Sequence, residues 1–189
     1  MNTPNKLTVA RIVLTPVFLL IFTLPQIPYH YLIAMLVYML ASVTDYFDGK
    51  IARSRGIVTN FGKFTDPLAD KMLTTAAFLG MMAMGYCNVW ILFIILFREF
   101  GISSIRLVAA AQGVVIPANM WGKVKTFSMM IFTGFIFLLL SLRFDFGVLP
   151  EGFPLETVAS ILLWITAILT AISGITYIIE GTKVIDFSK

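Results

Sequence analysis

The sequence has few charged residues and only one cysteine. Of its 189 residues 13% are charged and 59% are hydrophobic, whereas a soluble domain carries about a quarter charged residues. This apolar excess is too large to bury in one small core, which favours a lipid bilayer as its solvent. Because Cys87 is the only cysteine, a disulfide within the chain and a metal site built from cysteines are both excluded. We interpret Cys87 as a small hydrophobic side chain.

Features that mark several other classes of protein are also absent. The net charge is +4, but the basic residues are dispersed, so the sequence does not indicate nucleic-acid binding. No linker, repeat or low-complexity tract divides the chain, and we expect a single domain over residues 1–189. The apolar N-terminal segment has no small-x-small cleavage site after it, so we expect a retained membrane span rather than a signal peptide.

Six mainly apolar segments are long enough to cross a bilayer, which takes about 20 residues of helix. They cover residues 7–24, 29–46, 67–86, 89–111, 120–142 and 155–179. Most connections between them are short and rich in turn residues. The sequence therefore predicts an all-α integral membrane protein, built as a bundle of six transmembrane helices.

Basic residues gather at one end of the predicted spans. They are Lys6, Arg11, Lys50, Arg53, Arg55, Lys63, Lys123, Lys125, Lys183 and Lys189. The opposite loops offer only Arg143, beside Asp145, Glu151 and Glu156. Because cytoplasmic loops carry the excess of Lys and Arg, we predict that both termini and the loop between the second and third spans face the cytoplasm. An even number of spans agrees with this, since it puts both termini on one side.

Two acidic residues lie where the second apolar segment ends. Asp45, Asp48, Gly49, Ala52 and Arg53 follow one another at i, i+3, i+4, i+7 and i+8. If the second helix continues through them, they share one face. The two small residues on that face would let a bulky ligand approach the helix backbone.

A second set consists of Gly62, Asp66 and Asp70, spaced by four residues where the third span begins. Four carboxylates close together at a membrane boundary repel one another, and divalent cations would offset both this repulsion and the cost of burial. All-oxygen ligands suit Mg²⁺ or Mn²⁺, and paired acids suit a two-metal site for phosphoryl chemistry.

Each aspartate taken alone has a simpler interpretation. Asp66 precedes Pro67, which is typical of a helix N-cap. Asp45 or Asp48 alone could pair with a basic neighbour at the membrane surface. These alternatives do not explain four acids, three small residues and an arginine at helical spacing on two adjacent elements, so the joint pattern favours a functional site.

The pattern Asp45-x2-Asp48-Gly49-x2-Ala52-Arg53-x8-Gly62-x3-Asp66-x3-Asp70 resembles the complete signature of the CDP-alcohol phosphotransferases, with eight matches over 26 residues. The resemblance implies that Asp45, Asp48 and Asp66 ligate two divalent ions, Mg²⁺ or Mn²⁺. It implies that Asp70 contributes to the second ion and acts as the general base on the acceptor hydroxyl. It also implies a homodimer, with CDP-diacylglycerol as the donor.

The same resemblance implies which residues hold the cytidine diphosphate part of the donor. Gly49, Ala52, Arg53 and Gly62 would line its pocket. The opening segment Pro4-Asn5-Lys6-Leu7-Thr8-Val9-Ala10-Arg11 also resembles that of the family, and Asn5 and Thr8 could contact the nucleotide or the diphosphate. An equally supported alternative is that Thr3 or Asn5 caps a helix that starts near Lys6.

A basic cluster in the fourth and fifth spans bears on the acceptor. Arg98, Glu99 and Arg106 lie in the fourth span, and Lys123 and Lys125 open the fifth. Charged residues at membrane depth face a cavity or pair with each other, so a structural ion pair and a substrate role explain Arg98 and Glu99 equally well. Two lysines at a helix N-terminus suit a bound phosphate. Contact with lipid headgroups is their alternative role.

We therefore predict that Arg98, Arg106, Lys123 and Lys125 bind the phosphate of the acceptor. Glycerol 3-phosphate is the expected acceptor, since the segments around these residues also resemble the branch of the family that uses it; inositol phosphate is the competing anionic acceptor. An ion transporter is the main non-enzymatic alternative, because charges inside a membrane also mark ion paths. Against it, the acids gather at one membrane face, and no inverted repeat is present.

Overall fold

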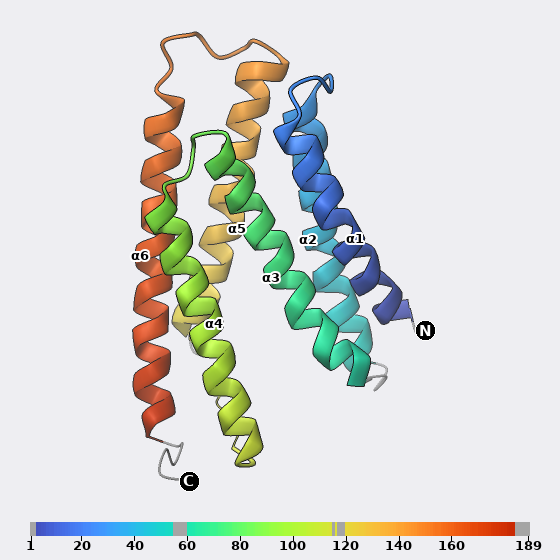
Figure 1. Cartoon of the computed structure of the whole chain (residues 1–189), viewed down its shortest axis with the longest axis vertical. Helices are drawn as coiled ribbons and strands as arrows, with labels where there is room; N and C mark the ends of the chain where they lie inside the picture. Colours follow the sequence, from blue (N-terminus) through green and yellow to red (C-terminus); the bar gives the residue numbers. More distant parts are fainter. Residues whose placement is uncertain (1–2, 55–59, 115, 117–119, 184–189) are drawn as a thin grey trace. The chain divides into compact units, whose positions relative to one another are not determined.

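The computed structural model describes residues 3–54, 60–114, 116 and 120–183, except for the side chains of residues 3, 4, 45–54, 60, 63 and 64. These residues form helices and no strands, so the all-α prediction is confirmed for the described part of the chain. The helices are α1 (Thr3–Thr23), α2 (His30–Ser54), α3 (Asn60–Ala83), α4 (Val89–Ala111), α5 (Met120–Leu140), the π-helix η1 (Ser141–Asp145) and α6 (Leu155–Thr182) (Figure 1).

Each predicted span corresponds to one α-helix, but the ends near the aspartates differ. Helix α2 runs on to Ser54, past the predicted end at residue 46, and α3 begins at Asn60, seven residues before the predicted start. The apolar run marks only the part of a helix that suits an apolar solvent, whereas the backbone hydrogen bonds continue through the polar signature. The expected continuation of the second helix through positions 45–53 is confirmed.

Three helical stretches of the described residues are long and apolar enough to cross a membrane: Asn5–Thr23, Met120–Asp145 and Leu155–Thr182. A shorter apolar helix, His30–Thr44, leads into the aspartates of α2. Helices α3 and α4 are not among them, and each carries at least three charged residues. These residues are Lys63, Asp66, Asp70 and Lys71 in α3 and Arg98, Glu99 and Arg106 in α4. Six membrane crossings therefore stay a prediction.

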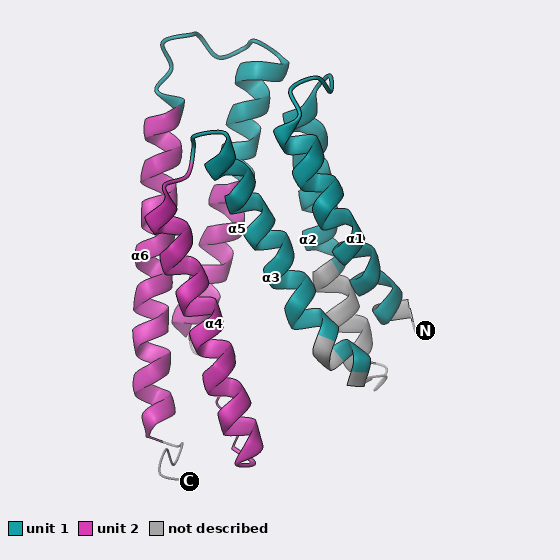
Figure 2. Ribbon diagram, in the orientation of Figure 1, with its two compact units in different colours: residues 1–86, 134–155 teal, residues 87–133, 156–189 magenta. Residues whose placement is uncertain are grey.

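The chain divides into two compact units (Figure 2). The first comprises Met1–Tyr86 and Gly134–Leu155, and the second comprises Cys87–Thr133 and Glu156–Lys189. Each unit therefore contains segments from both halves of the sequence. The prediction of a single domain over residues 1–189 is not tested by this division.

The core of the first unit is an aromatic cluster where α1 packs against α2 and α3. Phe18, Phe22 and Phe137 are fully buried. The ring of Phe137 lies 4.9 Å from that of Phe22 and 5.3 Å from that of Tyr38, measured between centroids. Such ring pairs contribute about 0.5–1.5 kcal/mol each beyond the area that they bury. The cluster holds α1 against its neighbours and so fixes the polar residues nearer the start of that helix.

Gly80 allows α3 to approach α1 closely. A Cβ atom at this position would lie 2.8 Å from Cδ1 of Phe22, which is shorter than two carbon atoms can approach. Because Phe22 is fully buried in the aromatic cluster, its ring has little room to move away. The glycine therefore sets the spacing between α1 and α3.

The N-terminus of α2 is capped by a residue far away in the sequence. The backbone N–H of Leu32 donates a 2.7 Å hydrogen bond to Oδ2 of Asp145, in η1. The first turn of α2 has no acidic residue of its own, and a carboxylate at a helix N-terminus stabilises the exposed N–H groups. Asp145, expected to lie in a loop, thus ties the end of α5 to the start of α2.

Cys87, in the connection between α3 and α4, is buried. Burial raises the pKa of its thiol to about 12, so the side chain stays protonated and unreactive near neutral pH. This agrees with its interpretation as a small hydrophobic side chain.

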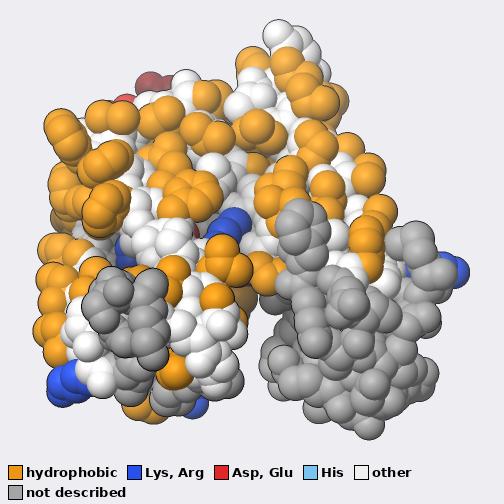
Figure 3. All heavy atoms as spheres, turned by 60° about the horizontal axis from the view of Figure 1, so that its bottom comes forward, with side chains coloured by type: hydrophobic (Ala, Val, Ile, Leu, Met, Phe, Trp, Pro, Cys, Tyr) orange, Lys and Arg blue, Asp and Glu red, His pale blue; other side chains and the backbone are white. Residues whose placement is uncertain are grey.

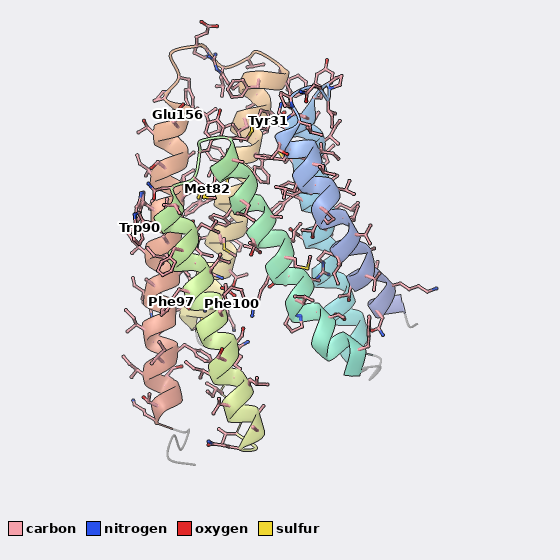
Figure 4. The ribbon with its side chains drawn as sticks, in the orientation of Figure 1. Tyr31, Met82, Trp90, Phe97, Phe100 and Glu156 are labelled. Atoms are coloured by element: carbon pink, nitrogen blue, oxygen red, sulfur yellow. The ribbon has the colours of Figure 1, made fainter. Side chains whose placement is uncertain are left out.

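Large apolar side chains cover much of the face shown in Figure 3. On α4, Trp90, Phe97 and Phe100 project from the helix (Figure 4) and are 63%, 70% and 61% exposed. Exposed apolar surface on this scale marks contact with a membrane or another protein. The observation agrees with a lipid environment for this helix.

We expect Gly80→Ala to destabilise the protein by about 1–3 kcal/mol, because the added methyl group overpacks the contact with Phe22. The measurement is the unfolding temperature of the purified protein in detergent. Gly134→Ala is the matched control, since this helical glycine has nothing within 4 Å of an added Cβ. Equal unfolding temperatures for the two variants would contradict the packing argument.

Candidate active site

The acidic signature lies on α2 and α3 of the first unit. Five of its positions lie in the part of α2 whose side chains are outside the described residues. They are Asp45, Asp48, Gly49, Ala52 and Arg53. The described part of the signature is therefore its α3 portion, Gly62, Asp66 and Asp70.

Asp66 lies inside α3 and is not its N-cap. The helix begins at Asn60, six residues earlier, and Pro67 also lies within it. The capping interpretation of Asp66 is therefore excluded. Instead, the hydroxyl of Thr8 on α1 donates a 2.7 Å hydrogen bond to Oδ1 of Asp66. Thr8 is only 1% exposed, so this bond fixes a half-buried carboxylate from a neighbouring helix.

Gly62 and Asp70 lie one turn to either side of Asp66 on α3. Because residues four apart on a helix share a face, the predicted common face of these three residues is confirmed by the helical backbone. Gly62 is buried, whereas Asp70 is exposed. The rise of an α-helix separates the two aspartates by about 6 Å along the axis, close enough for both carboxylates to reach one site.

The start of α1 carries a buried polar stripe. Helix α1 begins at Thr3, so Asn5 lies inside its first turn and does not cap a helix that starts near Lys6. Asn5, Thr8 and Arg11, spaced by three residues, are all buried. Burying such side chains is costly unless they are hydrogen-bonded, so this end of α1 is built for polar contacts. Sequence reasoning assigned Arg11 only to the cytoplasmic charge excess, and its spacing from Thr8 was the signal that it missed.

The carboxylates of the described part of the signature suit a hard divalent ion. Asp66 and Asp70 offer carboxylate oxygens, the ligands that Mg²⁺ and Mn²⁺ prefer. Across the described ranges, no group of three or more His, Cys, Asp or Glu side chains could hold a metal ion. Asp45 and Asp48, the other half of the predicted ligand set, have side chains outside those ranges.

The second unit contains a cluster of charges around Glu99. Its Oε1 atom accepts a 2.9 Å hydrogen bond from Nη1 of Arg98 and another from Nζ of Lys125. Nη2 of Arg98 donates to Oγ of Ser173 on α6 at 2.7 Å. The structural ion pair between Arg98 and Glu99 is thus present. One carboxylate faces two cations, which leaves a net charge of about +1 on these three residues.

Gly174, on α6, leaves room for the side chain of Arg98 on α4. A Cβ atom at this position would lie 3.0 Å from Cγ of Arg98, so any larger residue would push the arginine stem away. Ser173 is fully buried beside it. Sequence reasoning missed both residues, although a small and a polar residue next to each other in an apolar helix were a signal for them.

Arg106 has a different partner from Arg98. Its Nε atom donates a 2.9 Å hydrogen bond to the hydroxyl of Tyr177 on α6, and its Cζ atom lies 5.2 Å from the centroid of that ring. Tyr177 is buried, whereas Arg106 is exposed. Tyr177 is a further residue that the sequence did not single out.

The two lysines of α5 do not act as one group. Lys125 is 3% exposed and is paired with Glu99, whereas Lys123 is exposed. Residues two apart on a helix point in nearly opposite directions, so only one of them can face α4. The structure therefore brings Arg98 and Lys125 together and leaves Lys123 apart from them.

Comparison with known protein families agrees with the acidic signature on α2 and α3. A family model described as CDP-alcohol phosphatidyltransferase matches residues 1–172. The chain belongs to this family. The resemblance given by the acidic signature and the expectation of a phosphotransferase enzyme are thereby confirmed. Together with the three apolar helices, family membership indicates a membrane protein.

Curated relatives cover nearly the whole chain. The CDP-diacylglycerol–glycerol-3-phosphate 3-phosphatidyltransferase of Bacillus subtilis is 37% identical over 100% of this chain and 99% of its own length. The protein of the same name from Rickettsia bellii is 38% identical, with 93% of each chain covered. A probable phosphatidylglycerophosphate synthase of Mycobacterium tuberculosis is 35% identical over 96% of this chain and 82% of its own.

We expect Glu99→Gln to lower the stability of the protein by about 3–5 kcal/mol, because it leaves the cations of Arg98 and Lys125 without their shared carboxylate. The unfolding temperature in detergent reports the loss. Glu156→Gln, which removes an exposed carboxylate from the first turn of α6, is the control and should change stability by no more than about 0.5 kcal/mol. An unfolding temperature of Glu99→Gln equal to that of the wild type would show that the pair is not stabilising.

Proposed function

We propose that this protein transfers the phosphatidyl group of CDP-diacylglycerol to glycerol 3-phosphate, with release of CMP. The observation that carries the proposal is the similarity over the full chain to the Bacillus subtilis protein, whose name states this reaction. The complete acidic signature supports the donor half of it. In the reaction, the acceptor oxygen bonds to the phosphatidyl phosphorus, and the bond from that phosphorus to the CMP oxygen breaks.

The proposed metal ligands are Asp45, Asp48, Asp66 and Asp70, holding two divalent ions. Members of this family generally use divalent metal ions, and Mg²⁺ or Mn²⁺ suits a set of carboxylate oxygens. Such ions, when bound, neutralise charge on the diphosphate and on the departing CMP. Asp70 takes the proton of the acceptor hydroxyl, and its exposed position on α3 supports access to a substrate.

For the donor, we propose a pocket lined by residues of α1, α2 and α3. They are Asn5, Thr8, Gly49, Ala52, Arg53 and Gly62. The burial of Asn5, Thr8 and Gly62 supports a built polar pocket at this end of the first unit. Thr8 has a further role here, because its hydroxyl holds Oδ1 of Asp66. It therefore orients an expected metal ligand as well as lining the pocket.

We assign the acceptor phosphate to Arg98, Arg106, Lys123 and Lys125. The excess of cations over carboxylate around Glu99 supports an anionic acceptor, since a neutral alcohol such as serine would leave that excess uncompensated. Inositol phosphate would satisfy the same charges. The basic residues therefore favour a phosphorylated alcohol, and the similarity to the named relatives favours glycerol 3-phosphate.

The proposed arrangement in the membrane has six crossings, with both termini and the acidic signature at the cytoplasmic face. The gathering of Lys and Arg at one end of the spans supports this orientation. We also propose a homodimer in the cell membrane, as the family resemblance implies. The exposed apolar side chains of α4 are compatible with it.

The test is the release of CMP by the purified protein, supplied with CDP-diacylglycerol and Mg²⁺ or Mn²⁺. Glycerol 3-phosphate, inositol phosphate, inositol and serine are each added separately. We expect release with glycerol 3-phosphate alone, and its loss with a chelator because the proposed ions are removed. Asp70→Asn is the inactive control. Release with another alcohol would correct the acceptor, and no release from folded protein with any of them would refute the proposal.

We expect Thr8→Val to weaken metal binding by about tenfold or more, because losing the partner of a metal ligand typically has this effect. The measurement is the Mn²⁺ concentration that half-saturates the rise in unfolding temperature, which needs no turnover. Thr15→Val is the matched control on the same helix, since among the described residues the buried Thr15 hydroxyl bonds to the carbonyl of Arg11, one turn earlier. The same Mn²⁺ dependence in both variants would argue against this role for Thr8.

A further inference from the structure

Tyr177 fixes the orientation of Arg106 through two contacts. The tyrosine is 2% exposed, so its ring and hydroxyl are held by the surrounding helices. The hydroxyl accepts the hydrogen from Nε of Arg106 at 2.9 Å, and the guanidinium carbon lies 5.2 Å from the centroid of the ring. A hydrogen bond at one edge and a cation–π contact together restrict both the position and the tilt of a planar guanidinium.

The Tyr177 contacts leave the outer end of the guanidinium available. Within the described part of the chain, no hydrogen bond or ion pair involves Nη1 or Nη2 of Arg106, whose side chain is exposed. These two nitrogens form the fork that binds phosphate oxygens in pairs. An exposed arginine whose guanidinium is held at Nε is arranged for an anion at its other two nitrogens.

The neighbouring cations are arranged differently. Arg98 is bonded to Glu99 and Ser173, and Lys125 is bonded to the same carboxylate. Glu99 and Arg106 are seven residues apart on α4, so they share a face and lie about 10 Å apart along its axis. Arg106 is therefore held at a distance from the carboxylate that compensates Arg98 and Lys125.

The chemical nature of the group that contacts Arg106 determines how much of the positive charge of Arg106 is offset. A carboxylate at the position of the Tyr177 hydroxyl would also hold Arg106, but it would cancel the positive charge that attracts an anion. A hydroxyl partner brings no carboxylate charge to the contact, so it fixes the geometry of the guanidinium and leaves its positive charge intact. The pairing of a buried phenol with an exposed guanidinium therefore suits the binding of an anion.

We propose that Tyr177 is a positioning residue that orients Arg106 toward the phosphate of the acceptor, and so selects a phosphorylated alcohol. This inference rests on the proposed function and adds a residue to it. Tyr177 itself need not contact the substrate. Its hydroxyl acts through Arg106.

Tyr177→Phe tests the inference, because it removes the hydroxyl and keeps the ring. We expect the KM for glycerol 3-phosphate to rise about tenfold, which corresponds to about 1.4 kcal/mol and to the loss of one hydrogen bond. The kcat and the KM for CDP-diacylglycerol should stay within about twofold, since the donor residues are untouched. Tyr31→Phe, which removes the hydroxyl of another buried tyrosine, is the matched control and should leave all three constants unchanged.

A double-mutant cycle separates positioning from a structural effect. In the Arg106→Lys background, which has no guanidinium to orient, adding Tyr177→Phe should not raise the KM for glycerol 3-phosphate further. An equal rise in that background would overturn the inference. The inference would also be overturned if Tyr177→Phe lowered both kcat and the unfolding temperature, because a tyrosine with a purely structural role would produce that result.

The wild-type assay distinguishes a failure of the proposed function from a failure of the role proposed for Tyr177. If the wild type releases no CMP with glycerol 3-phosphate, the proposed function fails and this inference fails with it. If the wild type is active and Tyr177→Phe has the same KM for glycerol 3-phosphate, only the positioning role of Tyr177 is refuted.

Discussion

Every charged side chain within an apolar helix must find a partner, and this constraint shapes both units of the protein. A buried charge without a partner costs several kcal/mol. In the second unit, one carboxylate, Glu99, compensates Arg98 and Lys125. In the first unit, the hydroxyl of Thr8 supports the carboxylate of Asp66. These charges lie on α3, α4 and α5, and each is compensated or supported by a side chain close to it.

Uncharged side chains on α1 and α6 also contact the charged residues of α3 and α4. Helix α1 supplies Thr8 to Asp66 on α3, and α6 supplies Ser173 and Tyr177 to the arginines of α4. Close packing makes these contacts possible. Gly80 lets α3 approach α1, and Gly174 leaves space for the stem of an arginine. Asp66, Arg98 and Arg106 are therefore positioned in part by residues that have no charge of their own.

The distance along the chain between two interacting residues explains what the sequence could and could not predict. Apolar runs and helical spacing are local, so they predicted one helix for each span and the common face of Gly62, Asp66 and Asp70. The signature indicated the family because all its positions lie within 26 residues. The partners Thr8, Asp145 and Tyr177 act on residues 58, 113 and 71 positions away. Tertiary packing makes such pairs, and no local pattern reveals them.

The two arginines of α4 show how partner chemistry assigns different roles to the same residue type. Arg98 is paired with a carboxylate and a serine, so much of its charge is neutralised where it lies. Arg106 is paired with a phenol at Nε, so its charge is not offset by that partner. A carboxylate partner compensates much of the charge of a guanidinium, whereas a neutral partner leaves that charge for a phosphate. Helix α6 gives each arginine a neutral hydroxyl, Ser173 or Tyr177, and the difference follows from Glu99, which lies next to Arg98 on α4 and seven residues from Arg106.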